Sequence, residues 1–255
     1  MQWREGWRRA AGATMGLVLA AGANGAAADD ARDAERAAMV EEIVAMVRDT
    51  AATTGRSALA PRVIAALAAV PRHRYVPSGL AHEAYANRPL PIGHGQTISQ
   101  PFIVALMTDL AAPGPGDVVL EIGTGSGYQA AVLARLARQV HSIEIVEPLG
   151  REAAQRLASL AVNNVAVTIG DGYRGLPERA PFDAIVVTAG APRVPQPLVD
   201  QLKPGGRLVI PVDRGWTGQE LLLIVKRADG SLERSVVLPV RFVPLTGPGA
   251  RSRAP

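Results

Sequence analysis

The sequence predicts an α/β fold, a doubly wound and mostly parallel sheet that is preceded by a layer of helices. From residue 118 onward, short apolar runs alternate with helical patterns, as they do in sheets whose strands are joined by crossover helices. The first apolar run, 118–122, ends in three glycines at alternate positions, Gly123, Gly125 and Gly127. Because ligands of such sheets bind at the carboxyl ends of the strands, we expect the functional site beside these glycines.

The composition favours one catalytic domain and argues against several classes of protein. With 255 residues and 48% hydrophobic content, the chain can bury one substantial core. The absence of cysteine excludes disulfides and thiolate chemistry, and the four histidines lack the spacing of metal ligands, so we expect no metal. The net charge of +4 comes from scattered arginines and only 4% of residues are aromatic, which disfavours a nucleic-acid partner.

Residues 1–28 have the pattern of an N-terminal extension. Three arginines in the first nine residues precede a small, apolar stretch over 10–23, and three alanines stand before Asp29. This pattern is typical of a secretory signal, although an unstructured extension, or a true start at Met15 or Met39, also fits. The apolar stretch is too short for a convincing transmembrane helix, so we expect no stable membrane association.

Residues 29–110 form the expected helical layer and substrate-loop region. Apolar residues at helical spacing predict a packing helix within 29–48. A second helix is expected to begin at Pro61, since proline suits the first turn, and to end before Pro71. We expect the two arginines of the following loop, 71–77, to lie in solvent.

Residues 88–101 predict an irregular loop, rich in polar side chains, of the kind that often carries function. A helix over 102–110 follows it. Ser99 suits two roles: it can cap this helix, a contact worth about 1 kcal/mol, or it can serve in the active site. The pattern alone favours neither role.

The glycine-rich turn after residue 122 indicates a ligand that the backbone approaches closely. Glycines without side chains permit that approach, and the N-terminus of the next helix, over 130–137, offers unpaired N–H groups. The spacing is G-x-G-x-G, whereas dinucleotide-binding loops have G-x-G-x-x-G. Tyr128 occupies the third position of that fingerprint, which disfavours a nicotinamide or flavin dinucleotide.

Two acidic residues follow at the ends of later strands. A second strand over 140–145 carries Glu144 about 20 residues after Gly123, where a carboxylate can accept both hydroxyls of a ribose. The alternative is a surface carboxylate. A third strand, 165–169, is followed by Gly170-Asp171-Gly172, which can reach the edge of an adenine or form only a turn.

The remaining strands complete the sheet. We expect a fourth strand over 183–190 and, after a K-P-G-G-R turn at 203–207, a fifth over 208–211. Three more strand candidates, including an antiparallel edge, lie at 221–226, 235–238 and 241–243. The core would then span 111–246, with a disordered tail at 247–255.

These motifs together resemble a known family. E-I-G-T-G-S-G-Y, Glu144, G-D-G and K-P-G-G-R occur in the order found in class I S-adenosylmethionine-dependent methyltransferases. G-Q-T-I-S-Q-P at 95–101, with P-R-H-R-Y-V-P, D-A-I-V-V-T-A and R-F-V-P-L-T, makes the chain similar to bacterial protein-L-isoaspartate O-methyltransferases over 39–246. The resemblance implies transfer of a methyl group from S-adenosyl-L-methionine to the α-carboxylate of L-isoaspartyl residues in damaged proteins, which starts repair through a succinimide.

The resemblance also implies roles for individual residues. Ser99 matches the family's active-site serine, with Thr97 beside it. The implied cofactor-binding residues are Glu121, Gly123, Gly125, Gly127, Glu144, Asp171 and Gly172. The implied substrate-binding residues are Val243, Pro244, Leu245 and Thr246.

The family's general properties imply further expectations. Its members act in the cytoplasm on isoaspartyl-containing proteins, with a variant order of the last sheet strands. We expect a cytoplasmic monomer here, or a periplasmic enzyme if residues 1–28 are a signal. A methyltransferase for another substrate, such as a small molecule or RNA, and a non-catalytic domain that binds S-adenosylmethionine remain as alternatives.

Overall fold

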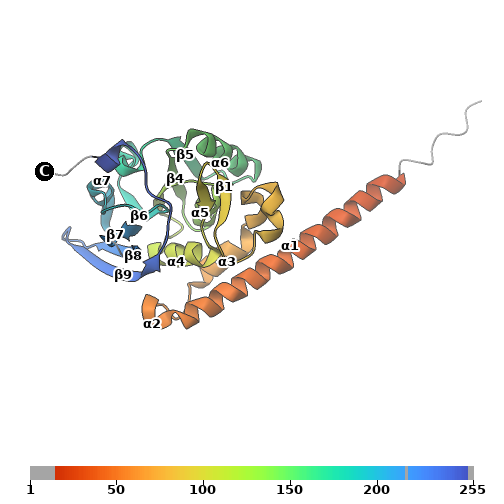
Figure 1. Ribbon diagram of the computed structural model, residues 1–255, viewed down its shortest axis with the longest axis horizontal. Coiled ribbons are helices and arrows are strands. Elements are labelled where there is room, and N and C mark those ends of the chain that lie inside the picture. Colours follow the sequence, from red (N-terminus) through yellow and green to blue (C-terminus); the bar gives the residue numbers. More distant parts are fainter. Residues whose placement is uncertain (1–14, 216–217, 252–255) are drawn as a thin grey trace, which may run out of the picture.

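The computed structural model describes residues 15–215 and 218–251, and it has the expected α/β architecture (Figure 1). Seven strands form the main sheet in the order β5-β4-β3-β6-β7-β8-β9. The first five of these are parallel, β8 runs antiparallel to β7, and β9 runs antiparallel to β8. The bounds are β3 Val118–Ile122, β4 Gln139–Glu144, β5 Val165–Ile169, β6 Phe182–Val187, β7 Leu202–Asp213, β8 Gln219–Lys226 and β9 Leu232–Val240.

Helices cover both faces of this sheet. They are α1 Met15–Asp49, α2 Ala51–Thr54, α3 Pro61–Ala69, α4 Pro101–Ala111, α5 Tyr128–Ala134, α6 Glu147–Ser159 and α7 Gln196–Asp200. Short 3-10 helices are η1 Arg72–Tyr75, η2 Ser78–Glu83, η3 Gly172–Arg174, η4 Pro177–Arg179 and η6 Pro248–Arg251. The strand-and-helix alternation of the sequence therefore gives the predicted doubly wound sheet.

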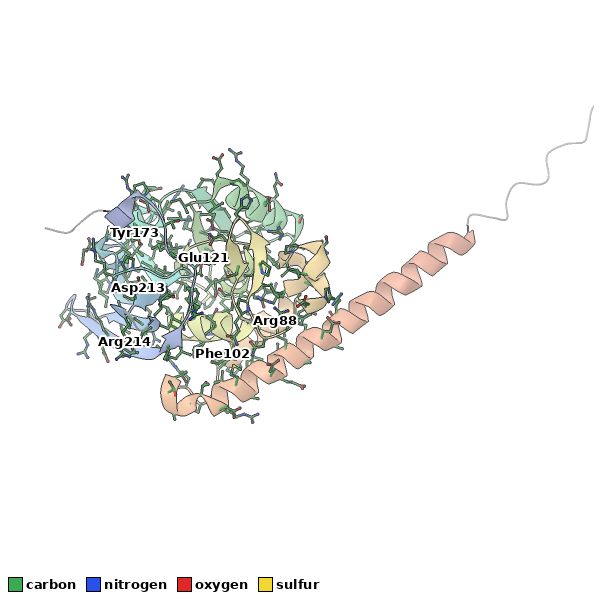
Figure 2. All side chains as sticks on the ribbon, viewed as in Figure 1. Arg88, Phe102, Glu121, Tyr173, Asp213 and Arg214 are labelled. Carbon is green, nitrogen blue, oxygen red and sulfur yellow. The ribbon has the colours of Figure 1, made fainter. Side chains whose placement is uncertain are left out.

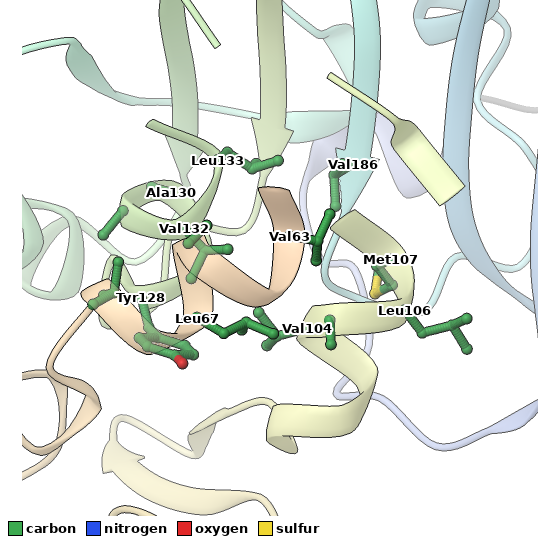
Figure 3. Close-up of a cluster of buried hydrophobic side chains, with 14 of the residues drawn as sticks. Val63, Leu67, Val104, Leu106, Met107, Tyr128, Ala130, Val132, Leu133 and Val186 are labelled. Atoms are coloured by element: carbon green, nitrogen blue, oxygen red, sulfur yellow. The ribbon is translucent and has the colours of Figure 1, made fainter. Parts of the chain in front are cut away.

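The core lies in two apolar clusters, one on each face of the sheet. Alternation along β3 places Val119 in one cluster and Leu120 and Ile122 in the other. Figure 3 shows side chains of α3, α4 and α5 packed together beside β6 in the first cluster. The N-terminal helices thus share a core with the sheet.

Helix α1 begins earlier than the sequence predicts. The expected helix starts at Asp29, whereas α1 already includes residues 15–28, and residues 1–14 lie outside the described part of the chain. The first half of α1 runs away from the body, and its second half packs on it through Ile43 and Val47 (Figure 1). None of the described helices is both long and apolar enough to cross a membrane.

The prediction of an irregular loop over 88–101 was wrong in its first part. Strands β1 Leu90–Gly93 and β2 Gln96–Ile98 form an antiparallel hairpin, in which Leu90 pairs with Ile98. The sequence pattern did not indicate these short strands, because Pro89 and Pro91 lie beside or within the first of them and proline argues against a strand. Ser99 follows directly after the hairpin.

The expectation of solvated arginines in 71–77 was also wrong for Arg72, which is fully buried. Its Nε donates to the carbonyl of Ala84 at 2.8 Å, and its guanidinium lies 4.9 Å from the centre of the Tyr128 ring. Burial lowers the pKa of Arg72 to about 10. A local pattern of arginine and proline could not reveal this distant aromatic partner.

The C-terminal region differs from the prediction in three places. The K-P-G-G-R segment lies within β7, whose pairing with β6 is irregular there. Residues 241–243 form no strand, although Gly190 makes an isolated bridge with Pro244. The expected tail instead includes η6, and residues 252–255 lie outside the described part.

Candidate active site

Three adjoining cavities open where the parallel strands β3, β4 and β6 end. The first is here called the loop cavity. Its lining residues are Gln96, Thr97, Ile122, Gly123, Gly125, Ile143, Glu144, Ile145, Val146, Gly172, Thr188, Ala189, Val243, Pro244, Leu245 and Thr246. This is the place where a doubly wound sheet binds its ligand.

The second cavity is a mostly apolar groove, and the third is a small cavity between the groove and the glycine loop. The groove is lined by Met46, Pro89, Thr97, Ser99, Gln100, Phe102, Ile103, Thr188, Leu238, Pro239, Val240, Arg241, Phe242 and Val243. The small cavity is lined by Thr97, Ile98, Ser99, Val104, Gly123, Thr124, Gly125, Ser126, Tyr128, Gln129 and Thr188. Thr97 and Thr188 line all three, so the cavities meet at these two side chains.

The first two glycines of the loop bring backbone to the cavity wall. Gly123 has a φ of +94°, and a Cβ there would collide with the Thr188 hydroxyl. That hydroxyl donates to the Gly123 carbonyl at 2.6 Å, while the Gly123 N–H donates to the carbonyl of Ile143 at 2.8 Å. Gly123 is therefore held between two strands, with no room for a side chain.

Gly127 does not line any of these cavities. Its φ is +86°, and a Cβ there would press against Leu157 of α6. It is the residue that precedes α5. The glycine repeat thus supplies cavity-lining residues at Gly123 and Gly125, and a turn with close helix packing at Gly127.

Glu144 lines the loop cavity from the end of β4 and is only 5% exposed. Its Oε2 accepts the Gly125 N–H at 2.8 Å, and its Oε1 accepts the Val146 N–H at 2.9 Å. A carboxylate offers about four acceptor positions, so Glu144 fixes the loop and can still accept two hydroxyl groups from a ligand.

Glu121 lies beneath the loop, in the centre of the body, and lines none of the three cavities (Figure 2). The Ser142 hydroxyl donates to its Oε2, and the same hydroxyl lies 2.6 Å from that of Thr124. Burial, with a further contribution from the Glu144 charge, raises the pKa of Glu121 to about 8. Through Ser142, Glu121 is linked to Thr124 of the glycine loop.

Replacing Glu121 with glutamine should remove a pH dependence of folding. The folded-state pKa of about 8 lies above the ordinary value of 4.5, so folding favours the protonated acid. The stability that this group contributes is full below pH 4.5 and is lost as the pH rises through 8. Relative to Glu121→Gln, the free energy of unfolding of the unsubstituted protein should fall by about 1 kcal/mol per pH unit in this window, measured by urea denaturation.

Glu147→Gln is the matched control, because Glu147 is exposed at the start of α6 and its ion-pair partner among the described residues is the exposed Arg151. It should show no such trend. A stability difference between the unsubstituted protein and Glu121→Gln that stays constant over this pH window would contradict the burial of a protonated acid.

Of the G-D-G segment, only Gly172 faces the loop cavity. A Cβ on Gly172 would collide with Ile122, so the wall requires glycine here. Asp171 instead accepts the Tyr173 N–H at 3.0 Å and the Gly249 N–H at 2.8 Å. These bonds cap η3 and connect η6 to it.

The segment 243–246 lines the loop cavity with all four of its residues, and Val243 also reaches the groove. Gly190, which follows β6, holds the segment in place. Its N–H donates to the Val243 carbonyl at 2.8 Å, and its carbonyl accepts the Leu245 N–H at 2.7 Å. The segment therefore forms a wall between the two cavities.

Ser99 lines the groove and the small cavity, and it does not cap α4. The residue before α4 is Gln100, whose side chain makes no capping bond. The Phe102 N–H is satisfied from outside the helix by Asn87 Oδ1 at 3.0 Å. Within residues 15–215 and 218–251 the Ser99 hydroxyl makes no hydrogen bond, which leaves it available to a ligand.

Thr188 is the residue at the junction that the sequence interpretation missed. The prediction placed it in the fourth strand without a role, whereas it stands just after β6 and beside Gly123. Its place at a strand end next to the glycine loop was the available signal. Among the residues that the structure describes, no group of three or more potential ligands could hold a metal ion.

The sheet and site together define a class I S-adenosylmethionine-dependent methyltransferase. The residues fit that cofactor: side-chain-free backbone lines the cavity at Gly123, Gly125 and Gly172, and Glu144 supplies an anionic acceptor. The model of the family described as protein-L-isoaspartate(D-aspartate) O-methyltransferase matches residues 45–250. The chain belongs to this family. It is an enzyme that methylates isoaspartyl residues with S-adenosyl-L-methionine, which starts their repair.

Similar proteins agree with this assignment. A protein-L-isoaspartate O-methyltransferase 1 of Cupriavidus necator is 60% identical over 231 residues, which cover 91% of this chain and 89% of the relative. A protein-L-isoaspartate O-methyltransferase 2 of Polaromonas sp. is 60% identical over 209 residues, covering 82% and 99%.

Two solved structures are similar in fold. One protein-L-isoaspartate O-methyltransferase superposes with a TM-score of 0.70 at 29% identity, over 82% of this chain and 66% of its own. A Plasmodium falciparum chain, described as a candidate member of the family in complex with S-adenosyl-L-homocysteine, gives a TM-score of 0.65 at 27% identity, over 73% and 91%.

Proposed function

We propose that the methyl group is transferred at the junction of the three cavities, beside Thr97, Thr188 and Ser99. The observation that carries this proposal is that Thr97 and Thr188 line the loop cavity, the groove and the small cavity alike. A cofactor held in the loop cavity and a peptide held in the groove come together only where those cavities join.

Glu144 and the glycine loop would hold the adenosyl part of the cofactor. Glu144 has acceptor positions left for the two ribose hydroxyls, and Gly172 leaves room for the base. Glu121 and Asp171 would support these residues from behind, through Ser142 and through η3. The cofactor supplies a methyl group on a positively charged sulfur.

The protein's task in this reaction is orientation. A carboxylate with a pKa near 3.5 is ionised at neutral pH, so the attacking oxygen needs no general base. Ser99, whose hydroxyl bonds to no other group in the described part of the chain, would donate to that carboxylate, and Thr97 would assist it. The attacking oxygen would be held about 3 Å from the methyl carbon, on the side opposite the sulfur. Such orientation of the reacting atoms can supply much of the lowering of the reaction barrier.

The groove would receive the polypeptide on either side of the isoaspartyl residue. Its walls are apolar, with contributions from Met46, Phe102 and Leu238, and it opens at the exposed Arg241. Segment 243–246, which separates the groove from the loop cavity, would contact both substrate and cofactor. Isoaspartyl-containing proteins and peptides are accordingly the proposed partners.

The test is a methyl-transfer assay with tritiated S-adenosylmethionine and two peptides that differ only in an L-isoaspartyl or an L-aspartyl residue. Label should enter the isoaspartyl peptide alone, because the groove must present a free α-carboxylate to the junction. Equal labelling of both peptides would contradict the specificity. Cofactor binding without transfer to either peptide would support a non-catalytic domain.

The proposed location is the cytoplasm, because S-adenosylmethionine is made there. The proposed oligomeric state is a monomer. Amino-terminal sequencing of the natural protein tests the alternative: a chain that begins at Asp29 would indicate export through a cleaved signal.

A further inference from the structure

One wall of the groove is a continuous stretch of the chain. Six consecutive residues, 238–243, line it, from the last part of β9 into the segment that follows. Val243 stands at the end that meets the loop cavity, because it lines both. An extended polypeptide advances about 3.3 Å per residue, so a wall of this length can accompany several residues of a bound chain.

The charge in this groove is confined to one place. Among the described residues that line it, Arg241 alone carries a charge, and no carboxylate lies in the wall. Arg241 is exposed, and none of the ion pairs within residues 15–215 and 218–251 involves it. Its guanidinium is therefore available to an anionic group of a bound chain.

Arg241 projects from backbone that is fixed on both sides. The preceding residue, Val240, pairs with Gln219 in the sheet. The N–H of the following residue, Phe242, donates to the side-chain oxygen of the same Gln219 at 2.7 Å. Arg241 is two residues from Val243, so their Cα atoms are at most about 7 Å apart. The positive charge thus has a defined position along the groove, close to the junction.

We propose that Arg241 gives the enzyme a preference for isoaspartyl sites that have an acidic side chain about two residues away in the substrate. This inference rests on the proposed function, in which the isoaspartyl residue lies at the junction and its flanking chain in the groove. An extended substrate covers the distance from Val243 to Arg241 in about two residues. A basic side chain at that place would be repelled, so Arg241 selects among isoaspartyl sites.

Methyl transfer to a set of peptides tests this preference. The peptides share one L-isoaspartyl residue and differ only in a glutamate, glutamine or lysine two positions before it, and in a second set two positions after it. For one of the two sets, kcat/KM should be about 5-fold higher with glutamate than with lysine at low ionic strength, with glutamine between them. Added salt should reduce the difference, because the charges are exposed.

Two substitutions of Arg241 and one control assign the preference to this residue. Arg241→Gln should make the three peptides equivalent, and Arg241→Glu should reverse their order. Arg234→Glu is the matched control, because Arg234 is also exposed, also belongs to β9 and lines none of the three cavities. It makes the same change in net charge and should keep the original order.

Equal kcat/KM for the three peptides in both sets would overturn the proposal. A preference that survives in Arg241→Gln would do so too, because another group would then supply it. The same loss of preference in Arg234→Glu would point to the net charge of the enzyme and would also contradict the role of Arg241. In each of these cases the isoaspartyl peptides are still methylated, whereas failure of the proposed function would leave all of them unlabelled.

Discussion

Glu144→Gln should weaken the binding of S-adenosyl-L-homocysteine about 100-fold, as measured by calorimetry. Each carboxylate oxygen of Glu144 accepts a backbone N–H, one from Gly125 and one from Val146. A glutamine amide can accept only one of these, and its NH2 group would face the other N–H. The variant should therefore lose the anionic acceptor proposed for the ribose and should also displace the glycine loop.

Glu147→Gln provides the control, since this exposed glutamate lies three residues further on and lines none of the three cavities. Its affinity for S-adenosylhomocysteine should stay that of the unsubstituted protein. If Glu144→Gln also binds the ligand normally, Glu144 does not contact the cofactor and the loop does not depend on it.

Ser99→Ala should lower kcat for an isoaspartyl peptide about 100-fold, the usual effect of removing one oriented hydrogen-bond donor from an active site. Ser99 lines the groove and the small cavity but not the loop cavity, so the affinity for S-adenosylhomocysteine should remain unchanged. Steady-state assays with tritiated cofactor, together with calorimetry, give both quantities.

Ser99→Thr retains the hydroxyl and should keep part of the turnover that Ser99→Ala loses. A loss caused only by altered packing at this position would not be reversed by threonine. Ser159→Ala is the matched control, because that serine is exposed at the end of α6 and its hydroxyl donates to the Arg156 carbonyl within the same helix. Full turnover of Ser99→Ala would remove Ser99 from the reaction.

The sequence predicted the sheet well because its strands are short apolar runs that need no distant partner to be recognised. Strands β3 and β5 begin and end where the pattern places them. The hairpin β1-β2 was missed because its strands are short and contain proline. The order of the last strands depends on which edge pairs with which, and a single sequence does not contain that information.

In the site, too, the residues of the local motif could be predicted from the sequence, whereas their contacts with residues remote in the sequence could not. The motif and the family resemblance indicated Gly123, Gly125 and Glu144, and all three line the loop cavity. The motif could not reveal that Gly127 faces α6 or that Asp171 bonds to η6, because those partners are remote in sequence.

The part of α1 that packs on the core lies after the possible signal-cleavage site at Ala28. The first side chain of α1 in the described core is Met39, well beyond Ala28. Removal of residues 1–28 by a signal peptidase would therefore leave in place the core contacts of Met39, Ile43 and Val47. These contacts are the same whether or not the first 28 residues are removed, so the part of α1 that packs on the sheet domain does not distinguish a cytoplasmic enzyme from an exported one.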